Sequence, residues 1–539
     1  MKKIFKSIVA LLCCGAIFAS CEQEVPEVNM EVDVTSIEAE AQNPAEVAVT
    51  LTTNANWILT CPEWVTPSAK FGSGDAILTF AIETNYKDEK TNTKARSGEI
   101  KISGGGSTTG KGASVAIPVN QAGYTYVDPN PSIGGIDSVE ELLAFAEAVN
   151  KAGSLKRWQN DEGKICLLED LDMSGVTSWT PIGASVFSWG GNVLKCESGN
   201  MFDGHFDGQG HTIKNFKMVC ENEVAGTAWG LFGGLAPGAV VENLVFDSSC
   251  SLTVNTVIQT DCGVVAGMIW DARVINIVNN APMSYTCESG ASKRVTMGVV
   301  GMAFAQADST VVRKVVNNGK IVAKSGGSNQ NGATAIQPAG ILGFGTNENT
   351  STKIVAVVDC TNNGDMESAT ARTSGLVAAA NRYTHIRGCV NNGNQINSFN
   401  LKTEGDGAAA RIGNITCITG AGSCIYDTVN NGDVISTTKG AVAGVICLVN
   451  ADDNVFENVA SYGRVITDRT VNKYCGTYFG QCNKKATFTN CTAGGSFGAY
   501  NGGEYQVTPA TADNYWDYIG AIGANGVNAT KENIKFGTK

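Results

Sequence analysis

The five residues Cys360-Thr361-Asn362-Asn363-Gly364 belong to the clearest repeat in this chain of 539 residues. Closely similar copies begin at Val315, Cys389 and Thr428, and weaker ones begin at Ile277, Val459 and Cys491. Successive copies lie roughly 30 to 45 residues apart, which is the period of stacked supersecondary units with insertions of variable length. The repeat therefore predicts a repetitive architecture for the second and larger part of the chain.

Short apolar segments bracketed by Gly precede most copies of this repeat. They lie at 230–233, 263–267, 298–301, 340–343, 375–377 and 440–444. Asn-Gly between apolar strands is also a hairpin signal, and propeller blades have a similar period, so a β-propeller is the alternative architecture. Each unit, however, keeps one turn unchanged and varies in length elsewhere, as stacked coils do. We therefore predict a right-handed parallel β-helix over residues 136–539.

This architecture predicts which side chains stack on one another. The repeated Asn residues would form an amide ladder, in which each side chain bonds its neighbours in the coils above and below. The first residue of each copy would face inward, in a ladder that comprises Val315, Cys360, Cys389, Thr428, Val459 and Cys491. Such inward positions give these cysteines a structural role.

Both ends of the predicted β-helix have a candidate cap. Ser138 and Glu141 have the spacing of a helix capping box, and Gly153 is expected to stop the helix. The apolar face of this helix comprises Val139, Leu142, Leu143, Ala146 and Val149. The helix would cover strand edges that otherwise promote aggregation. At the other end, the expected cap comprises Tyr515, Trp516 and Tyr518.

Segments near the start of this region carry a family resemblance. They lie at 168–173, 179–183, 202–213 and 230–233. These segments resemble the opening coils of bacterial surface β-helix proteins with GLUG repeats, over residues 136–495. The resemblance implies an adhesin-like or glycan-associated surface protein, or a non-catalytic region of a large protease, and it implies no defined reaction.

A smaller all-β domain is expected at residues 33–123. Apolar and polar residues alternate at 47–51, 76–82, 99–102 and 114–120, which indicates the half-buried strands of an immunoglobulin-like β-sandwich. Residues 124–135 contain Pro129, Pro131 and two glycines without apolar periodicity, and they indicate a linker.

The sandwich region also resembles a known module. The segments concerned lie at 57–58, 62–65, 72–74, 85, 96–100 and 119–123. They resemble the BACON module, an immunoglobulin-like domain of carbohydrate-degrading surface systems in gut bacteria. The resemblance implies either glycan binding or a spacer, and we favour the spacer. Trp57 and Trp64 are expected in the core rather than against a sugar.

The first residues have the features of a lipoprotein leader. Three lysines precede an apolar run at 8–18 that is too short to span a bilayer. Phe-Ala-Ser-Cys at 18–21 resembles the bacterial lipobox, which implies a signal peptide over residues 1–20 and lipidation of Cys21 as the anchor. The tether at 21–32 is acidic and resembles signals that send lipoproteins to the outer cell face. We therefore expect an outer-membrane lipoprotein that faces the cell exterior.

Composition restricts the partners and the cysteine chemistry. A net charge of −12 argues against nucleic acid or an anionic membrane surface as the ligand. The chain has 18 cysteines, and an odd number remains once Cys13, Cys14 and Cys21 are assigned to the leader and anchor. Because no spacing fits a zinc site, we expect mostly free, buried thiols, and no metal or cofactor.

Many β-helices cleave polysaccharides, so an enzyme is the alternative function. Polygalacturonase-like hydrolases combine Asn-x-Asp, Asp-Asp, Gly-His-Gly and Arg-x-Lys, and this chain lacks the last two. Asp203 and Asp207 flank Gly in tight turns, where Asp bonds its own backbone. His205, His211 and His385 have no neighbours that suggest a triad. We therefore assign no catalytic residue, and a polysaccharide lyase or hydrolase stays the alternative.

Tryptophans outside the repeats are the candidate ligand contacts. Trp189 lies in a long insertion, Trp229 precedes a Leu-Phe turn, and Trp270 ends a Gly-bracketed segment. Exposed indoles stack on sugar rings or anchor protein partners, although they also cap coils. We expect a monomeric, non-catalytic surface protein whose β-helix binds a polysaccharide or a host glycoprotein. A structural component of a surface layer or appendage is a third hypothesis.

Overall fold

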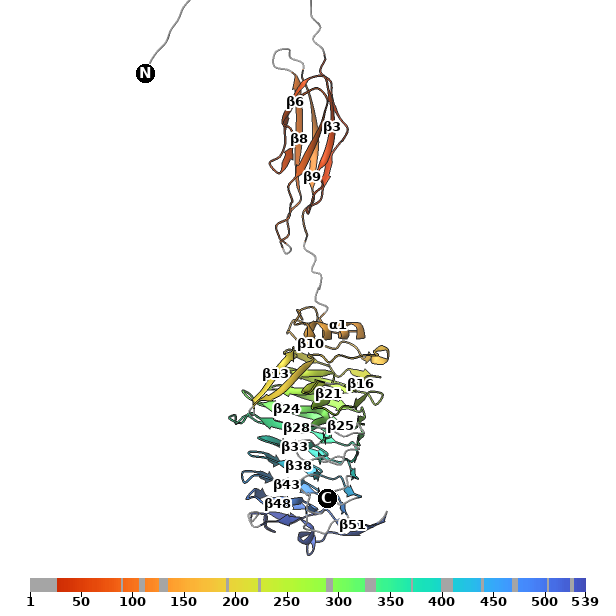
Figure 1. Cartoon of the computed structure of the whole chain (residues 1–539), viewed down its shortest axis with the longest axis vertical. Coiled ribbons are helices and arrows are strands. Elements are labelled where there is room, and N and C mark those ends of the chain that lie inside the picture. The colour runs from red at the N-terminus through yellow and green to blue at the C-terminus, as the bar shows by residue number, and fades with distance from the viewer. Residues whose placement is uncertain are drawn as a thin grey trace, which may run out of the picture. The chain divides into compact units, whose positions relative to one another are not determined.

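The computed structural model describes residues 27–88, 91–105, 112–125, 134–190, 193–221, 224–286, 294–324, 336–369, 372–398, 411–437, 441–467, 474–501, 504–523 and 528–539. The chain forms two compact units, Met1–Asn130 and Pro131–Lys539, which we describe one at a time (Figure 1). The predicted leader and its Cys21 lie outside the described residues. Within the described ranges, no helix is both long and apolar enough to cross a bilayer.

The first unit is a sandwich of two sheets. One sheet, in spatial order, comprises β1 (Met30–Val32), β3 (Val47–Thr53), β7 (Ala76–Ile82) and β5 (Val65–Pro67). The other comprises β2 (Ile37–Ala39), β9 (Gly112–Gln121), β8 (Arg96–Gly105), β4 (Asn56–Thr60) and β6 (Phe71–Ser73). Both sheets contribute to one core, with Leu51 and Phe80 from the first and Ile100 from the second. The predicted β-sandwich is confirmed.

Both tryptophans of the sandwich have structural contacts. Trp57 is 4% exposed, and its indole N–H donates to the carbonyl of Gly74 at 3.1 Å. Trp64 is half-buried against the core, with the guanidinium of Arg96 4.6 Å from its ring centroid. The core position of Trp57 is therefore as predicted, and Trp64 covers the core at its edge.

The second unit is a parallel β-helix, in which successive coils pair strand on strand (Figure 1). An 18-stranded sheet comprises β10 (Ile165–Cys166), β11 (Leu171–Asp172), β14 (His205–Asp207), β15 (Thr212–Lys214), β19 (Val240–Phe246), β22 (Arg273–Asn279), β25 (Thr310–Asn317), β29 (Val355–Val358), β30 (Thr361–Asn362), β34 (Thr384–Arg387), β35 (Val390–Asn391), β39 (Cys424–Tyr426), β40 (Val429–Asn430), β44 (Val455–Glu457), β45 (Ala460–Ser461), β49 (Thr487–Thr489), β50 (Cys491–Ala493) and β54 (Ile534–Phe536).

Three more sheets complete the coils. A 13-stranded sheet comprises β13 (Val193–Gly199), β12 (Ser185–Gly190), β17 (Thr227–Trp229), β18 (Phe232–Leu235), β21 (Thr260–Trp270), β24 (Val295–Ala305), β27 (Ile336–Pro338), β28 (Leu342–Asn347), β33 (Val377–Ala380), β38 (Thr416–Thr419), β43 (Ile446–Val449), β48 (Phe479–Cys482) and β53 (Ala521–Ile522). A 10-stranded sheet comprises β16 (Lys217–Cys220), β20 (Ser251–Val254), β23 (Met283–Tyr285), β26 (Ile321–Ala323), β31 (Met366–Ser368), β36 (Gln395–Asn397), β41 (Val434–Ser436), β46 (Val465–Thr467), β51 (Phe497–Asn501) and β52 (Glu504–Thr508). A four-stranded sheet comprises β32 (Arg372–Thr373), β37 (Arg411–Gly413), β42 (Ala441–Ala443) and β47 (Cys475–Gly476).

The Asn-Asn repeat forms two amide ladders. In the buried ladder each side-chain amide donates to the next coil at 2.8–2.9 Å, through Asn279, Asn317, Asn362, Asn391 and Asn430. In the exposed ladder each amide donates to the preceding coil at 2.8–2.9 Å, through Asn431, Asn392, Asn363, Asn318 and Asn280. The predicted amide ladder is confirmed, and it is double because both residues of the pair repeat.

The predicted inward ladder is also confirmed. Its members are all buried: Val315, Cys360, Cys389, Thr428, Val459 and Cys491. The ladder cysteines Cys360, Cys389 and Cys491 carry free thiols, as expected. Burial raises the pKa of the thiols of Cys262 and Cys360 well above the usual value, so these groups stay protonated and act as small apolar side chains.

The helix α1 (Val139–Asn150) covers the first coils, and the N–H of Glu141 donates to the hydroxyl of Ser138 at 3.3 Å. The predicted apolar face is wrong at one position, because Leu143 is 41% exposed whereas Phe145 is buried against Phe202 and Phe206. Helical periodicity alone did not determine which residues at the edge of that face are buried. The contacts of Phe145 with Phe202 and Phe206 determine it. The carboxylate of Glu141 accepts from Arg157 and Trp158 rather than closing a capping box.

Two short 3₁₀ helices accompany the caps: η1 (Met173–Gly175) and η2 (Tyr515–Tyr518). At η2 the hydroxyl of Tyr515 donates to the carbonyl of Ile534 at 3.1 Å, and Tyr518 stacks on Phe497 with ring centroids 5.7 Å apart. Trp516 packs against the core. The three aromatic residues expected in the cap therefore all have packing or hydrogen-bond partners.

Candidate ligand-binding pocket

The 13-stranded sheet is buried on both faces near the middle of the β-helix. Every residue of β24 is buried, and so is every residue of β21 except the last. One face contributes to the interior core, and the other carries a separate hydrophobic cluster, which we call the outer cluster. The outer cluster comprises Phe187, Leu194, Ala228, Met268, Met302, Phe304, Phe344 and Ala379. Burial without alternation indicates that this outer face is covered, because a solvated face would alternate with polar residues.

The hairpin β12–β13 covers part of this face and brings Trp189 to it. The rings of Trp189 and Phe304 meet edge to face, with centroids 5.6 Å apart and an interplanar angle of 87°. Trp270 meets the same ring at 5.5 Å and 83°. Such pairs are favourable because the positive edge of one ring meets the negative face of the other. Phe304 therefore brings together two of the three tryptophans singled out from the sequence.

The third tryptophan lies elsewhere. Trp229 packs against the interior core, and its indole N–H is buried without a hydrogen-bond partner among the described residues. Trp270 also has a buried indole N–H without a described partner, and its ring packs against the outer cluster. Of the three, Trp189 lines the pocket that follows.

A pocket of about 200 Å³ opens beside the outer cluster. Trp189 and Phe344 form its apolar wall. Its polar lining comprises Arg294, Thr346, Asn347, Asn349, Asn381 and Arg382. These residues come from the hairpin, from the segment before β24, from β28 and the loop after it, and from the turn after β33, so four stretches of chain meet at one place.

The guanidinium of Arg294 lies over the aromatic wall. Its guanidinium carbon is 4.3 Å from the ring centroid of Phe344 and 6.0 Å from that of Trp189. One terminal nitrogen lies 3.6 Å from a carboxylate oxygen of Asp261, and the two side chains are 16% and 2% exposed. The hydroxyl of Thr296 donates to the same oxygen at 2.8 Å. Burial raises the pKa of Asp261, while the charge of Arg294 acts to lower it.

The other side of the pocket is a set of fixed polar groups. Arg382 donates to the side-chain oxygen of Asn349 at 2.7 Å and to its carbonyl at 3.0 Å. The amide of Asn381 donates to the hydroxyl of Thr346 at 3.1 Å, and the amide of Asn347 donates to the carbonyl of Lys353 at 3.1 Å. These bonds hold the planar side chains in place before any ligand arrives, which lowers the entropy cost of binding.

Three polar atoms of this pocket have no described partner. They are buried, and they comprise Nε of Arg294, Nε of Arg382 and the side-chain oxygen of Asn347. A buried polar group without a partner costs about 1–3 kcal/mol, so each one favours a ligand or water that satisfies it. An aromatic wall beside convergent, unsatisfied polar groups is the usual composition of a small-molecule site. The arrangement can bind a small polar ring, and its described lining contains no nucleophile paired with a base.

Sequence analysis found Trp189 and missed the polar lining. Arg294, Phe344 and Arg382 belong to three coils whose insertions differ in length, so no spacing connects them. One available signal was the Asn that ends or follows a Gly-bracketed strand, as at Asn347 and Asn381.

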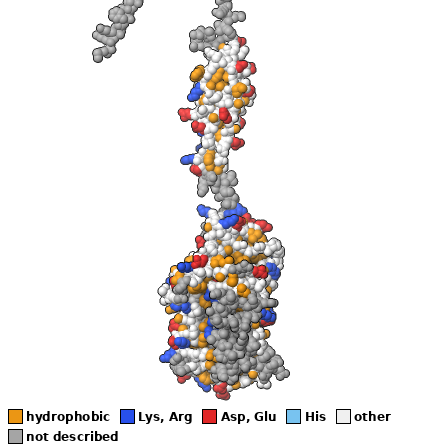
Figure 2. Space-filling view, in the orientation of Figure 1, with side chains coloured by type: hydrophobic (Ala, Val, Ile, Leu, Met, Phe, Trp, Pro, Cys, Tyr) orange, Lys and Arg blue, Asp and Glu red, His pale blue; other side chains and the backbone are white. Residues whose placement is uncertain are grey.

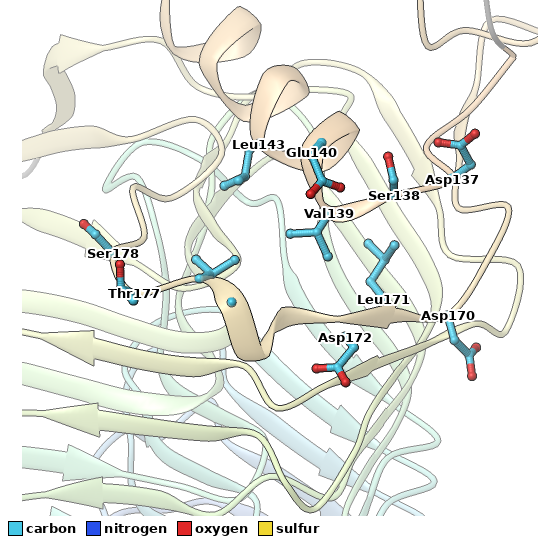
Figure 3. A pocket seen from close by; sticks show the side chains of 12 residues that line it. Asp137, Ser138, Val139, Glu140, Leu143, Asp170, Leu171, Asp172, Thr177 and Ser178 are labelled. Atoms are coloured by element: carbon cyan, nitrogen blue, oxygen red, sulfur yellow. The ribbon is translucent and has the colours of Figure 1, made fainter.

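A second hollow, of about 590 Å³, lies beside α1 and is lined with acids (Figure 3). Asp170 accepts from Lys214 at 2.8 Å and from the N–H of Thr212 at 2.9 Å, and these bonds lower its pKa to about 2. Asp172 accepts from the N–H of Ser174 at 3.0 Å. Asp172 also accepts from the side-chain amide of Asn215 at 2.9 Å, so both carboxylates link the first coil to the next. The described residues that line the hollow include no aromatic side chain.

The histidines that sequence analysis weighed have structural partners. His205 lies 2.7 Å from Glu242, and His211 lies 3.3 Å from Asp170. Asp207 accepts from the N–H of Gln209 at 2.9 Å, which is the turn role expected for it. Across the described ranges, no group of three or more His, Cys, Asp or Glu side chains is placed to hold a metal ion.

No protein-family model and no curated protein matches the chain. One similar solved structure is the Bacteroides ovatus GH5 xyloglucanase in complex with a XXXG heptasaccharide, at 16% identity and a TM-score of 0.15, covering 20% of this chain and 22% of that one. Another is an IgA1 protease, at 14% identity and a TM-score of 0.34, covering 88% of this chain and 29% of that one. This chain thus spans less than a third of either structure, and these likenesses carry no argument about activity.

Proposed function

We propose that this chain is a non-catalytic, lipid-anchored surface protein whose β-helix binds a glycan in the pocket between Trp189 and Arg382. Cys21 is the anchor in this proposal, and the sandwich is a BACON-like spacer. In this proposal the β-helix is of the kind found in GLUG-repeat proteins, which its opening segments resemble. The protein faces the cell exterior as a monomer, and its partner is a polysaccharide or a host glycoprotein.

The observation that carries the proposal is the composition of the pocket. Sugar rings have apolar C–H faces and a rim of hydroxyls, so they bind where an aromatic wall meets planar amide and guanidinium groups. Trp189 and Phe344 supply the wall, and Asn347, Asn381 and Arg382 supply the planar groups. Because hydrogen bonds already fix two of these polar side chains, the site is preorganised.

The polysaccharide lyase or hydrolase is the competing hypothesis. Glycosidases use a pair of carboxylic acids across the bond they cleave. The described residues that line the pocket include no Asp or Glu, and Asp261 pairs with Arg294 at 3.6 Å without lining the pocket. In the acid-lined hollow, Asp170 already accepts from Lys214 and Asp172 already accepts from Asn215. These contacts favour binding without cleavage.

A glycan array with a parallel assay for released sugars tests this proposal. The chain from Glu22 to Lys539 is applied as wild type, as Trp189→Ala and as Trp64→Ala. Trp64→Ala is the matched control, because it truncates a half-buried tryptophan of the other unit. We expect binding without sugar release, at least a tenfold loss of affinity in Trp189→Ala and no loss in Trp64→Ala.

Two results would overturn the proposal. Release of oligosaccharide by the wild type, abolished by Asp170→Asn or Asp172→Asn, would make the acid-lined hollow an active site. Equal binding by Trp189→Ala and the wild type, with both folded by circular dichroism, would place the ligand elsewhere.

A further inference from the structure

The pocket has a charge that glycan binding in general does not require. Among the described residues, Arg294 and Arg382 line it and no carboxylate does. This imbalance runs against the composition of the chain, which has 51 acidic and 39 basic residues. On the face shown in Figure 2, acidic and basic side chains of the larger unit are interspersed.

Arg294 retains a charge that its neighbours only partly balance. Its contact with Asp261 is 3.6 Å, longer than the roughly 2.7–2.9 Å of a charge-assisted hydrogen bond. Its other close polar neighbour is the sulfur of Met302 at 3.3 Å, a weak acceptor. Nε has no described partner. A ligand oxygen is therefore the strong acceptor that this guanidinium lacks.

Arg382 is held in place by a neutral partner. Asn349 accepts from both of its terminal nitrogens, through the side-chain oxygen at 2.7 Å and the carbonyl at 3.0 Å. These contacts fix the plane of the guanidinium without neutralising it. Nε is buried and has no described partner. Since guanidinium groups match the geometry of carboxylates, an anionic oxygen is the group that best completes this site.

We propose that the pocket takes an acidic sugar, with a ring against Trp189 and its anionic group between Arg294 and Arg382. This inference rests on the proposed function and specifies its ligand class. A volume of about 200 Å³ is below the roughly 300–1,000 Å³ of sites for drug-sized ligands, so the pocket holds one sugar residue of a longer chain. The carboxylate of a uronic acid supplies two acceptor oxygens, and a sulfate ester supplies the same kind of charge.

The aromatic wall favours a sugar over other anions. Arg294 already covers the ring of Phe344. Inorganic phosphate or an acidic peptide side chain would satisfy the arginines but would leave Trp189, the other aromatic residue of the pocket, without a ligand contact. A sugar ring with a carboxylate satisfies both, because its C–H face packs against Trp189 while its anionic edge meets the guanidinium groups.

Titration calorimetry of the chain from Glu22 to Lys539 tests the inference. The probes are trigalacturonate, its methyl ester, a sulfated oligosaccharide, a neutral trisaccharide and inorganic phosphate. The ester has the same ring and lacks the charge, so it isolates the anionic group. The variants are Arg294→Gln, Arg382→Gln and, as a matched loss of one exposed charge, Arg464→Gln, whose arginine pairs with Asp433 away from the pocket.

We expect trigalacturonate or the sulfated probe to bind at least tenfold more tightly than the ester and the neutral sugar. Arg294→Gln and Arg382→Gln should each abolish that preference, Arg464→Gln should retain it, and the preference should weaken with added salt. The relative affinity for the two acidic probes identifies the anionic group.

Two outcomes would contradict the inference, and they are distinguishable from failure of the proposed function. Equal binding of acidic and neutral sugars, with Trp189→Ala still impaired, would overturn the acidic-sugar inference and leave glycan binding intact. Phosphate binding as tight as that of trigalacturonate would overturn it in favour of a simple anion site. Failure of every saccharide to bind would overturn both proposals, and circular dichroism of each variant excludes unfolding as the cause.

Discussion

Truncating one rung of the buried amide ladder should destabilise the β-helix far more than truncating its exposed neighbour. Asn362 is 1% exposed, and its amide donates to Asn391 at 2.8 Å and to the carbonyl of Gly364 at 3.1 Å. Its side-chain oxygen accepts from Asn317 at 2.8 Å. Asn362→Ala therefore removes three buried hydrogen bonds, each worth about 1 kcal/mol, and leaves the oxygen of Asn391 without this donor. We expect a loss of about 3–5 kcal/mol in the free energy of unfolding.

Asn363→Ala is the matched control. Asn363 makes two ladder bonds of 2.8 Å, but it is exposed, so water replaces them and the expected loss is below about 1 kcal/mol. Urea unfolding followed by circular dichroism measures both values, and hydrogen exchange shows whether the amides around 360–364 and 389–393 lose protection first. Equal effects of the two substitutions, or a loss below about 1 kcal/mol for Asn362→Ala, would refute the ladder as a source of stability.

Three further predictions concern the pocket, the first coils and the anchor. Phe304→Ala should lower the free energy of unfolding, measured in urea, by about 3–5 kcal/mol because the ring is fully buried. It should also weaken saccharide binding, because Phe304 packs against Trp189. Unchanged binding would show that Trp189 does not need this contact. Lys214 and the other hydrogen-bond donors lower the pKa of Asp170 from 3.8 to about 2. The ionised carboxylate therefore stabilises the fold fully above pH 3.8, and this stabilisation disappears as the pH falls through about 2. The urea midpoints of wild type and Asp170→Asn should accordingly differ at neutral pH and converge near pH 2, and a constant difference would contradict this. Cys21→Ser should abolish incorporation of labelled fatty acid in the producing bacterium, and retained label would show that the lipobox resemblance is wrong.

The repeat predicted the stacking of the coils because its signal is local. Five of the seven copies keep Asn-Asn at the same turn. Parallel strands place equal positions of successive coils directly above one another, as with Asn317 and Asn362. Burial of the first residue of each copy follows from the same register. The stacking of the coils could therefore be predicted from the local repeat alone, without knowledge of contacts between distant residues.

The pocket could not be predicted from the repeat. Trp189 contacts Phe304 across more than a hundred residues of sequence, and Arg294 reaches Phe344 in the next coil of the sheet. Neither pair shares a repeat position, so their proximity depends on how the hairpin β12–β13 folds over the outer cluster. The exposure of Leu143 has the same origin, since packing rather than periodicity decides which side of α1 is buried.

The most direct test of this account is a crystal structure of the chain from Glu22 to Lys539 with the saccharide that binds it best. The account predicts an intact sugar whose ring lies against Trp189, with an anionic oxygen within hydrogen-bond distance of Arg294 or Arg382. A sugar bound in the acid-lined hollow beside Asp170, a sugar bound to the sandwich unit, or a cleaved product in any site would contradict it.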